Sequence, residues 1–548
     1  MRDFCRAPSF IGRALLKGRA RSLLCEPGVV VAYRDADLRY PETAPFNPAE
    51  KFPEYPFGPE AVSPANGVYG AVRETLRLAG LDADRFGTPE WNPFRDLVGA
   101  GGTVLIKPNW VRHYHLRGET VFSLITHTSV VRPLIDYAYR AVGPEGRVWL
   151  MDAPLFDTDY STLTRVCQLG ELEQALRHRG VPLTIADLRS LVAETDRGVV
   201  VRRRERNCWD CEGVEFDLGT DSELTELGRT LRYTFGSDYD RRVTASHHAL
   251  VKGGQKHRYR ISKRALEADL VISVPKLKTH KKTGVTLNMK NMIGINTDKN
   301  YIPHYRIGAP SHGGDEFPDT ANLSVRGRRW LVRHAVDLVL GRLHGERLAN
   351  VFMRAWLPLV RGRAERRAGE RLDPVDVFYR TVQGDLVRTG NWWGNDTCWR
   401  TGVDMNKILL YGQLDGRLAT RPVRRYFSVI DGIVAGDRDG PLAPRPRPVG
   451  VLLAGFDPVS VDSVGTRLMG FDPRSFRDLE RASKIDAYPL VAGTSSPRVR
   501  SNRPEWDGDL DPHTHLAFQP HPAWAEHLTG QKTTADSETV LPFPEISA

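Results

Sequence analysis

The side chains with the greatest capacity for chemistry follow one short apolar run, Asp269–Val274, which ends at Pro275. The next residues form a lysine-rich stretch of Lys276, Lys278, Thr279, His280, Lys281, Lys282, Thr283 and Gly284. Neighbouring cations lower one another's pKa, so one lysine of such a cluster can serve as a base or nucleophile. We predict Lys278 for that catalytic role and His280 as the acid–base group.

Other lysines and amides of this region are suited to binding an anion. Ammonium groups hold phosphate or carboxylate as fixed charges, and threonines beside a glycine suit a tight anion-binding turn. We therefore predict a substrate-binding set of Lys276, Lys282, Asn288, Lys290 and Asn291. The alternative is a solvated charge run without a ligand, which the interleaved histidine and asparagines disfavour. The glycine spacing of nucleotide and dinucleotide loops is missing here.

A second polar group follows the apolar segment Thr103–Ile106. Lys107 and Asn109 are predicted to bind substrate, because open α/β sheets bind ligands beyond the carboxyl ends of their strands. Histidines two positions apart share one face of an extended segment, so a divalent metal site is predicted here as well. Its ligands would be His113, His115 and His127. Separate loop histidines, each with its own hydrogen bond, are an equally good interpretation.

Carboxylates and amides near other predicted elements complete the candidate site. Asp152 follows the apolar run Arg147–Met151, where a carboxylate would act as a general base or metal ligand, and we predict it as a catalytic residue. Asn395 and Asp396 lie at a predicted helix start beside two tryptophans and are assigned to substrate binding. The glycine-rich segment 431–441 is predicted as a loop that binds metal or substrate hydroxyls, with a structural turn as the alternative.

Alternating strands and helices must position these residues. Short apolar runs predict strands at Thr103–Ile106, Arg147–Met151, Leu183–Ala186, Asp269–Val274, Lys407–Tyr411, Tyr426–Ile430 and Val449–Leu453. Apolar residues three or four positions apart predict helices at Asn66–Leu78, Ser129–Ala141, Glu171–Arg179 and from Asp457 to Gly470. The alternation predicts an α/β fold with a mostly parallel or mixed sheet flanked by helices.

Composition divides the 548 residues into five parts. Residues 1–65 read as a basic extension, rather than a transit peptide, followed by an arm rich in proline and aromatic residues. Residues 66–321 and 373–480 form the two parts of the core. Residues 322–372 are a helical insertion rich in arginine, and 481–548 are a polar, proline-rich tail that we expect to be mobile from residue 495.

The net charge of +10 does not indicate a nucleic-acid-binding protein. The basic residues are concentrated in the first 25 residues and in 326–371, which has twelve arginines and four acids, and no nucleic-acid motif accompanies them. The insertion is either a lid or flank with solvated arginines, which we favour, or a surface that docks on anionic lipid or another acidic partner. Apolar windows are too short for a transmembrane helix.

Six cysteines in this length fit a reducing cytoplasm better than a disulfide framework. Cys208 and Cys211 form one C-x-x-C, and no second pair follows at zinc-site spacing. We interpret them as two ordinary thiols. Flavin and nicotinamide signatures are missing too, so the cofactor is unknown, with a divalent metal as the one candidate.

These motifs together resemble the domain-of-unknown-function 362 family over residues 65 to 475. The segments that carry the resemblance are Lys107–Trp110, Asp152–Pro154, Pro275–His280, Gly284–Gly294, His304, Gly313–Glu316, Gly390–Trp392, Gly394–Asp396, Asp431–Ile433 and Asp457–Pro458. Some relatives carry iron–sulfur ligands, but this chain lacks the required cysteine run, and we infer no cluster. The long-insertion branch resembles proteins found beside bacterial polysaccharide-synthesis genes.

The sequence thus predicts a bacterial, cytoplasmic enzyme that acts on a small anionic substrate. A phosphorylated or carboxylated sugar, or a nucleotide-sugar, is the expected class, with proton abstraction or metal-assisted transfer favoured over redox chemistry. The resemblance adds a role in surface polysaccharide synthesis. The alternative is a non-catalytic assembly factor at the inner face of the membrane, which would use 326–371 for contact.

Overall fold

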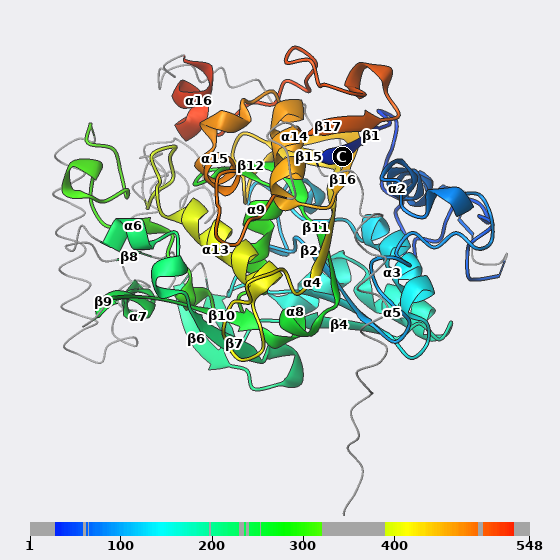
Figure 1. The fold of residues 1–548 in the computed structure, drawn as a ribbon, viewed down its shortest axis with the longest axis horizontal. Coiled ribbons are helices and arrows are strands. Elements are labelled where there is room, and N and C mark those ends of the chain that lie inside the picture. The colour runs from blue at the N-terminus through cyan, green and yellow to red at the C-terminus, as the bar shows by residue number, and fades with distance from the viewer. Residues whose placement is uncertain are drawn as a thin grey trace, which may run out of the picture.

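The computed structural model describes residues 28–530, except 59–61, 64, 197–198, 229–234, 237–240, 252–253, 321–388 and 492–496. Its largest element is a ten-stranded sheet with the order β17-β1-β16-β15-β11-β2-β3-β4, to which β12 and β13 are joined beside β15 (Figure 1). Its strands are β1 (Val29–Arg34), β2 (Thr103–Pro108), β3 (Arg147–Asp152), β4 (Leu183–Asp187), β11 (Leu270–Val274), β12 (Lys276–His280), β13 (Gly284–Thr286), β15 (Arg425–Asp437), β16 (Arg445–Gly455) and β17 (Arg498–Ser501).

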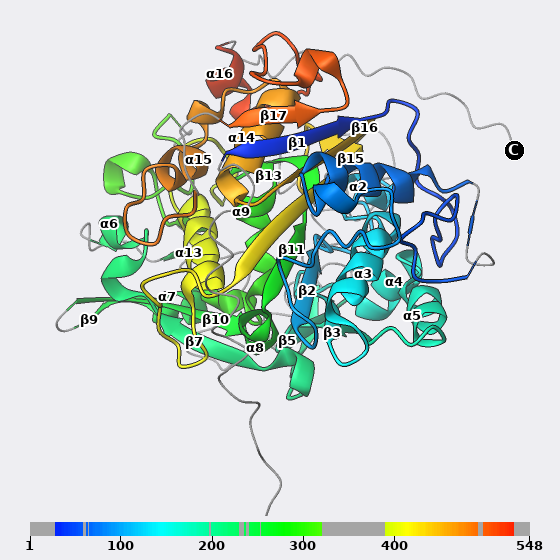
Figure 2. The same cartoon turned by 45° about the vertical axis from the view of Figure 1, so that its right-hand side comes forward.

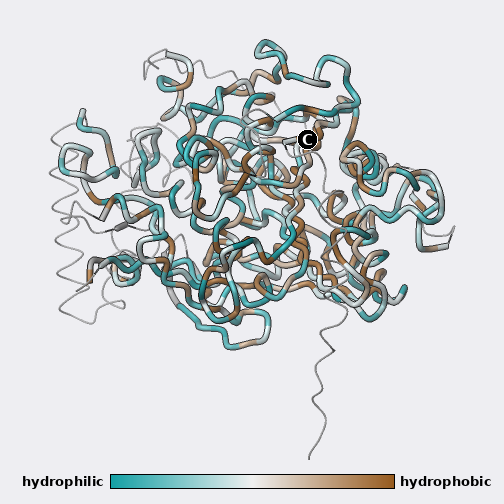
Figure 3. Tube along the Cα trace, viewed as in Figure 1, coloured by the Kyte–Doolittle hydropathy of each residue, from teal (hydrophilic) through white to brown (hydrophobic). Residues whose placement is uncertain are grey.

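The centre of this sheet, β15-β11-β2-β3-β4, is parallel. Strands β2 and β11 are buried along their whole length, as expected for continuous apolar runs covered on both faces. Hydrophobic residues accordingly concentrate on the central strands (Figure 3). The carboxyl ends of these strands meet at one edge, where Lys107 is in register with Ser273 and Asp152 with Asp187. The predicted α/β class is therefore confirmed.

Helices cover both faces of the sheet (Figure 2). One face carries α2 (Gly67–Leu78), α3 (Thr128–Val142), α4 (Tyr160–Val166) and α5 (Leu169–Arg177). The other carries α8 (Lys263–Glu267), α9 (Asn288–Asn291), α13 (Cys398–Tyr411), α14 (Pro458–Met469) and α15 (Arg477–Ala482). Strand β1 shows the division, because Val31 joins the core under α2 whereas Val30 and Ala32 join the core under α14.

The structured helices begin and end close to the predicted bounds. The side chain of Asn66 accepts from Val68 N at the start of α2, and that of Asp457 accepts from Ser460 N at the start of α14. Gly470 ends α14 in the left-handed conformation that glycine adopts readily. The predicted strand Lys407–Tyr411 is wrong, because it is the last part of α13. A short apolar run does not distinguish a buried helix from a buried strand.

Two segments predicted as loops are strands. The lysine-rich stretch forms β12, which pairs with β15 in parallel and with β13 in antiparallel. The glycine-rich segment after Ile430 continues β15 as far as Asp437. Pro275 interrupts the chain between β11 and β12, while Asp431 N donates to Pro275 O at 2.9 Å and keeps β15 attached there. The candidate lysines therefore lie on a buried sheet extension.

Smaller elements surround the sheet. The strands are β5 (Leu191–Asp196) with β6 (Val199–Glu205), β7 (Gly213–Asp217) with β10 (Gly254–Ser262) and β9 (His248–Val251), and β8 (Phe235–Gly236) with β14 (Tyr305–Arg306). The short helices are α6 (Thr225–Gly228), α7 (Arg241–His247) and α16 (Pro522–Thr529). The 3₁₀ turns are η2 (Ala83–Arg85), η3 (Val121–Ser123), η4 (Trp209–Cys211), η5 (Gly219–Asp221), η6 (Met292–Ile295), η7 (Lys299–Tyr301), η8 (Pro310–His312), η9 (Pro473–Ser475) and η10 (Pro504–Trp506).

The expectation of a mobile tail is wrong for residues 497–530. Strand β17 pairs with β1 in the main sheet, and Trp506 and Trp524 are buried in the core beneath α14. The first 25 residues and the arginine-rich insertion 322–372 lie outside the described residues. Among the helices that are described, none has both the length and the apolar character needed to cross a bilayer.

Candidate functional site

Lys107 and Asp152 form an ion pair where β2 and β3 end. Lys107 Nζ lies 2.8 Å from Asp152 Oδ1 and donates to Asn291 Oδ1 at 2.9 Å. Their side chains are 1% and 3% exposed. Burial lowers the pKa of Lys107, and the charge of Asp152 opposes this shift. Three residues predicted from separate segments are thus in direct contact.

The backbone around Asp152 fixes its carboxylate. Trp110 N donates to Oδ2 at 2.7 Å, and Ala153 N donates to Oδ1 at 2.9 Å. Gly294 lies so close that a Cβ there would be 2.1 Å from Asp152 Oδ1 and 2.4 Å from Lys107 Nζ. Only glycine fits beside this ion pair, which gives the Gly284–Gly294 motif a physical reason.

Strand β12 presents a polar face into the same region. Lys276, Lys278 and His280 alternate along it, while Leu277 points to the opposite face and joins the hydrophobic core. Lys278 Nζ donates to Asn109 Oδ1 at 3.0 Å and to Leu124 O at 2.6 Å, and both oxygens are uncharged. Burial lowers the pKa of Lys278 well below its usual value, and the nearby lysine charges lower it further.

Asn109 connects the two lysine environments. Its side-chain amide donates to Asn291 Oδ1 at 3.2 Å, and its carbonyl accepts from Lys278. Asn291 Oδ1 also accepts from Lys107. The polar contacts are therefore continuous from Asp152 to Lys278. We use the name lysine cluster for Lys107, Asn109, Asp152, Lys276, Lys278 and Asn291.

Lys276 has its own charge partner. Its Nζ lies 3.0 Å from Asp431 Oδ2 and donates to Tyr40 OH at 2.7 Å, and Tyr40 donates to Asp431 Oδ1 at 2.6 Å. His127 N donates to Asp431 Oδ2 as well, and the ring of His127 stacks on Tyr40 with centroids 4.1 Å apart. Tyr40 was not predicted in the site, because it comes from the extended arm, and Asp431 was predicted only within a glycine-rich loop.

His280 is a neutral, buried imidazole. Its Nδ1 accepts from Lys282 N at 3.0 Å and from Thr283 N at 3.2 Å, so its proton is on Nε2. Burial and the positive charges of Lys290 and Lys278 lower its pKa well below the usual value. The ring therefore closes the turn between β12 and β13 and has an N–H to donate.

Other predicted binding residues have structural partners outside the lysine cluster. Asn288 bonds to Asp462, Tyr426 and Ser428, which fixes the start of α9. Asn395 accepts from the backbone N–H of Cys398, the first residue of α13, at 2.8 Å. Lys282 contacts Thr389 O, and Lys290 contacts Cys398 Sγ. Asp396 forms an ion pair with Arg400.

The predicted metal ligands are engaged separately. His127 Nδ1 accepts from Ser129 N at 3.1 Å and caps α3, and burial lowers the pKa of His127 to about 3. His115 Nε2 contacts Pro444 O at 3.0 Å, and His113 Nδ1 accepts from Asp159 N at 3.1 Å. Within the described residues, the one group of three ligand atoms close enough to hold a metal is Cys208, Asp210 and Cys211. The three imidazoles are not brought together.

Lys299 is a buried lysine that the predicted site omits. Its Nζ donates to Ile293 O at 2.9 Å and Asn296 O at 3.0 Å. Burial lowers the pKa of Lys299 to about 7, with Asp152 opposing and Lys107 adding to the shift. Sequence offered no signal for this position beyond its place in a polar segment, because a lysine in a short turn is usually exposed.

Several buried donors near these residues have no hydrogen-bond partner among the described residues. They are Trp110 Nε1, Tyr160 OH and Asn296 Nδ2. Trp110 contacts Asp152 through its backbone, and Asn296 contacts Lys299. Because buried polar groups are nearly always paired, this concentration of unpaired donors is a mark of a ligand site.

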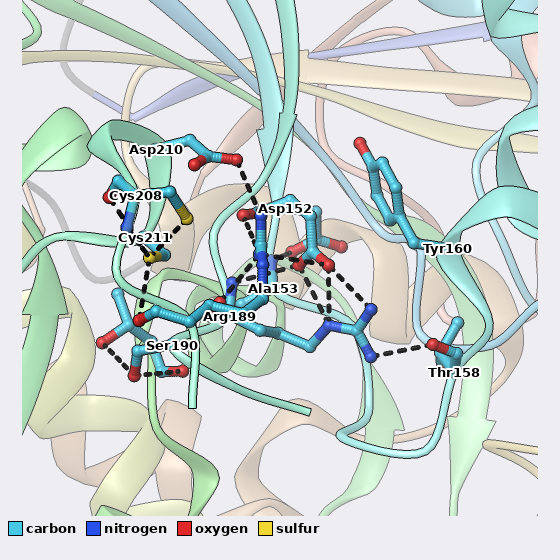
Figure 4. A network of polar contacts seen from close by, with 12 residues as sticks. Asp152, Ala153, Thr158, Tyr160, Arg189, Ser190, Cys208, Asp210 and Cys211 are labelled. Atoms are coloured by element: carbon cyan, nitrogen blue, oxygen red, sulfur yellow. Dashed lines mark hydrogen bonds and ion pairs between the residues drawn. The ribbon is translucent and has the colours of Figure 1, made fainter. Parts of the chain in front are cut away.

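A further charged layer lies behind Asp152. Arg189 binds both oxygens of Asp187, the register partner of Asp152, and donates to Thr158 O at 2.9 Å (Figure 4). Arg206 Nη1 donates to Asp187 O at 2.7 Å. The end of β4 is thus held by two guanidinium groups.

Comparison with known families matches residues 182–467 to the family described as "Domain of unknown function (DUF362)". The chain belongs to the DUF362 family. The matched region includes β11 to β15 and therefore the lysine-bearing strand β12. Lys107, Asn109 and Asp152 precede the matched region, and the first two contact Asn291 within it.

Individual relatives are distant. A thylakoid-associated protein of Synechocystis sp. is 22% identical over 238 residues, which cover 43% of this chain and 44% of the relative. The DUF362 chain thus spans less than half the length of the curated relative that it matches. A Thermotoga maritima crystal structure shares 10% identity and a TM-score of 0.20, with coverage of 41% of this chain and 38% of that one.

Proposed function

We propose that this DUF362 protein is an enzyme that binds a small anionic substrate at the lysine cluster and transfers a proton there. The substrate class is a phosphorylated or carboxylated sugar, or a nucleotide-sugar. Lys278 in its neutral form is the proton acceptor, and Lys107 and Lys276 hold the anion. His280 donates a hydrogen bond from Nε2. A role in polysaccharide synthesis belongs to the same proposal.

The observation that carries the proposal is the environment of Lys278 Nζ. The lysine cluster holds three buried lysine amines, and the two carboxylates beside them, those of Asp152 and Asp431, are already paired with Lys107 and Lys276. Lys278 contacts neutral oxygens within the described residues. A buried lysine without a countercharge favours its neutral form and gains a proton when an anion binds beside it.

The unpaired donors support the same assignment. An anion offers the acceptors that Trp110 Nε1 and Asn296 Nδ2 lack among the described residues. Lys299 adds a further base in reach of neutral pH. Gly294 packs directly against the Lys107–Asp152 pair, and its carbonyl accepts from Ala153 N at 2.9 Å.

Calorimetric titration tests the proposal. Glucose 6-phosphate, glucuronate and UDP-glucose are titrated into the protein at pH 7 in two buffers with different ionisation enthalpies. We expect at least one ligand to bind with net proton uptake, and affinity to rise as the pH falls, because the protonated lysine binds the anion. Lys278→Met should weaken binding by about tenfold or more.

The matched control removes a lysine from the surface. Lys484 is 65% exposed and pairs with Glu480, so Lys484→Met should leave affinity and proton uptake unchanged. Failure of all three ligands to bind, or binding that Lys278→Met leaves intact, contradicts the proposal. Turnover of the bound ligand, followed by proton NMR in deuterated water, separates catalysis from binding.

A second candidate is a membrane-surface or assembly factor. It draws on the relative whose name places it at thylakoids. The surface would be the arginine-rich segment 326–371, whose charge suits anionic lipid. Co-sedimentation with phosphatidylserine vesicles at low and high salt tests it, since binding should fall with salt and vanish when 326–371 is deleted. Equal binding to neutral vesicles contradicts it.

A further inference from the structure

Two cysteines lie at the edge of the charged layer behind Asp152. Cys208 precedes the turn η4 and Cys211 is its last residue, and their sulfur atoms are 2.7 Å apart (Figure 4). Both are free thiols in the structure, with Cys208 partly exposed and Cys211 buried. Cys208 N donates to Cys211 Sγ at 3.1 Å, so the backbone holds the two sulfurs on the same side of the turn.

The sulfur separation distinguishes a dithiol from a metal site. Two thiolates on one zinc ion are roughly 3.8 Å apart, given Zn–S distances of about 2.3 Å and tetrahedral angles. A disulfide needs about 2.05 Å. The observed 2.7 Å is nearer the disulfide. Asp210, the remaining candidate metal ligand, is already bound by Arg206 at 3.1 Å.

We propose that Cys208 and Cys211 are a reversible dithiol–disulfide site that exchanges with external disulfides. The Cys208 thiolate attacks one sulfur of a small-molecule disulfide, whose S–S bond breaks and releases one thiolate. Cys211 then loses its proton to solvent and attacks Cys208 Sγ, which releases the second thiolate. The protein loses two electrons and two protons, and the external disulfide becomes two thiols.

The exposure of the two sulfurs fixes their order of reaction. Cys208 is accessible to an external disulfide, whereas Cys211, 2% exposed, reaches only Cys208. Burial and hydrogen bonds with Asp210 and Cys211 raise the pKa of Cys208 to about 12, against the charge of Arg206. Exchange is therefore slow at neutral pH, and its rate rises about tenfold per pH unit because the thiolate is the nucleophile.

Oxidation also removes a thiol donor next to a residue that holds the end of β4. The one thiol proton of Cys211 is within hydrogen-bond reach of Cys208 O at 3.2 Å and Arg206 O at 3.3 Å, and a disulfide sulfur has no proton to donate. The guanidinium of Arg206 binds Asp187 O and Arg189 O. The redox state of Cys208 and Cys211 therefore affects a hydrogen-bond donor beside Arg206, which holds the end of β4.

Mass spectrometry of the full-length protein tests the proposal without reference to any substrate. The protein is equilibrated at pH 8.5 with oxidised or reduced glutathione, denatured, alkylated and digested with trypsin. Both cysteines fall in one tryptic peptide, 207–229. We expect this peptide to lose two hydrogen masses and both alkylation sites after oxidation, and to regain them with reduced glutathione.

Single substitutions report the mechanism. Cys211→Ser should retain one glutathione on Cys208, because the second attack is missing. Cys167→Ser, which removes a buried thiol from another part of the core, should behave as the unchanged protein. Two alkylated thiols in the peptide after oxidation overturn the proposal. Stoichiometric zinc that is lost in Cys208→Ser also overturns it, in favour of a metal site.

Discussion

Lys107 and Asp152, from neighbouring parallel strands, form an ion pair whose two side chains are almost fully buried. Removing one partner leaves an uncompensated charge in the core, which costs about 3–5 kcal/mol. We expect Lys107→Met to lose stability in that range. The double variant Lys107→Met with Asp152→Asn should lose less than the sum of the single losses. Urea denaturation measures these differences, and strict additivity would contradict the interaction.

The close approach of Gly294 to this pair predicts a second stability effect. Gly294→Ala places a methyl group against Asp152 Oδ1 and should destabilise the protein by about 1–3 kcal/mol through overpacking. Gly170→Ala is the control, because a Cβ at that position in α5 meets nothing within 4 Å. Thermal unfolding should show a lowered midpoint only for the first variant, and equal midpoints would refute the predicted clash.

Lys299 should make stability depend on pH. Its folded pKa of about 7 is below the ordinary value of 10.5, so the unfolded chain binds more protons between these values. Stability from this group therefore rises as pH increases from about 7 towards 10.5, and the penalty is fully present below pH 7. In Lys299→Met this rise should disappear. Denaturation at pH 7, 8 and 9 measures the free energy of unfolding of the variant and the parent. If the two free energies change equally with pH, the inference is wrong.

His280 should stay neutral throughout the range in which most histidines titrate. Burial and its lysine neighbours hold its pKa well below 6.5, and its Nδ1 accepts two backbone hydrogen bonds. Nitrogen NMR of labelled imidazoles should find the Nε2–H tautomer with constant shifts from pH 5 to 8. His280→Gln identifies the signal. A titration midpoint above pH 6 would disprove the neutral assignment.

Local signals in the sequence were sufficient for much of the sheet and its helices. Apolar runs predicted the central strands, and Asn66, Asp457 and Gly470 marked helix ends because capping is decided within a few residues. The strand predicted at Lys407–Tyr411 is wrong, because its apolar run fits the buried face of a helix equally well. The alternation of Lys276, Lys278 and His280 is a strand pattern, but its polar face is buried, which contradicts the usual expectation that charged residues are exposed.

The candidate site was predictable where strand ends define it. Parallel strands end at one edge, so Lys107, Asp152 and Lys278 were expected together, although their chemical roles stay predictions. Tyr40 was missed because its contact with Lys276 comes from tertiary folding of the extended arm, and Lys299 was missed because its burial in a short turn leaves no sequence pattern. The three histidines predicted as metal ligands each have a separate partner, because His113 accepts from Asp159 N, His115 contacts Pro444 O and His127 accepts from Ser129 N.

The pairing of β12 with β15 determines when the lysine cluster can form. Lys276 contacts a carboxylate 155 positions away and a tyrosine 236 positions away. Chain closure over such separations is slow, and amides in the last cooperative unit to open exchange with solvent only through global unfolding. The cluster should therefore assemble late during folding, and the backbone amides of β12 should exchange with solvent only when the whole sheet comes apart.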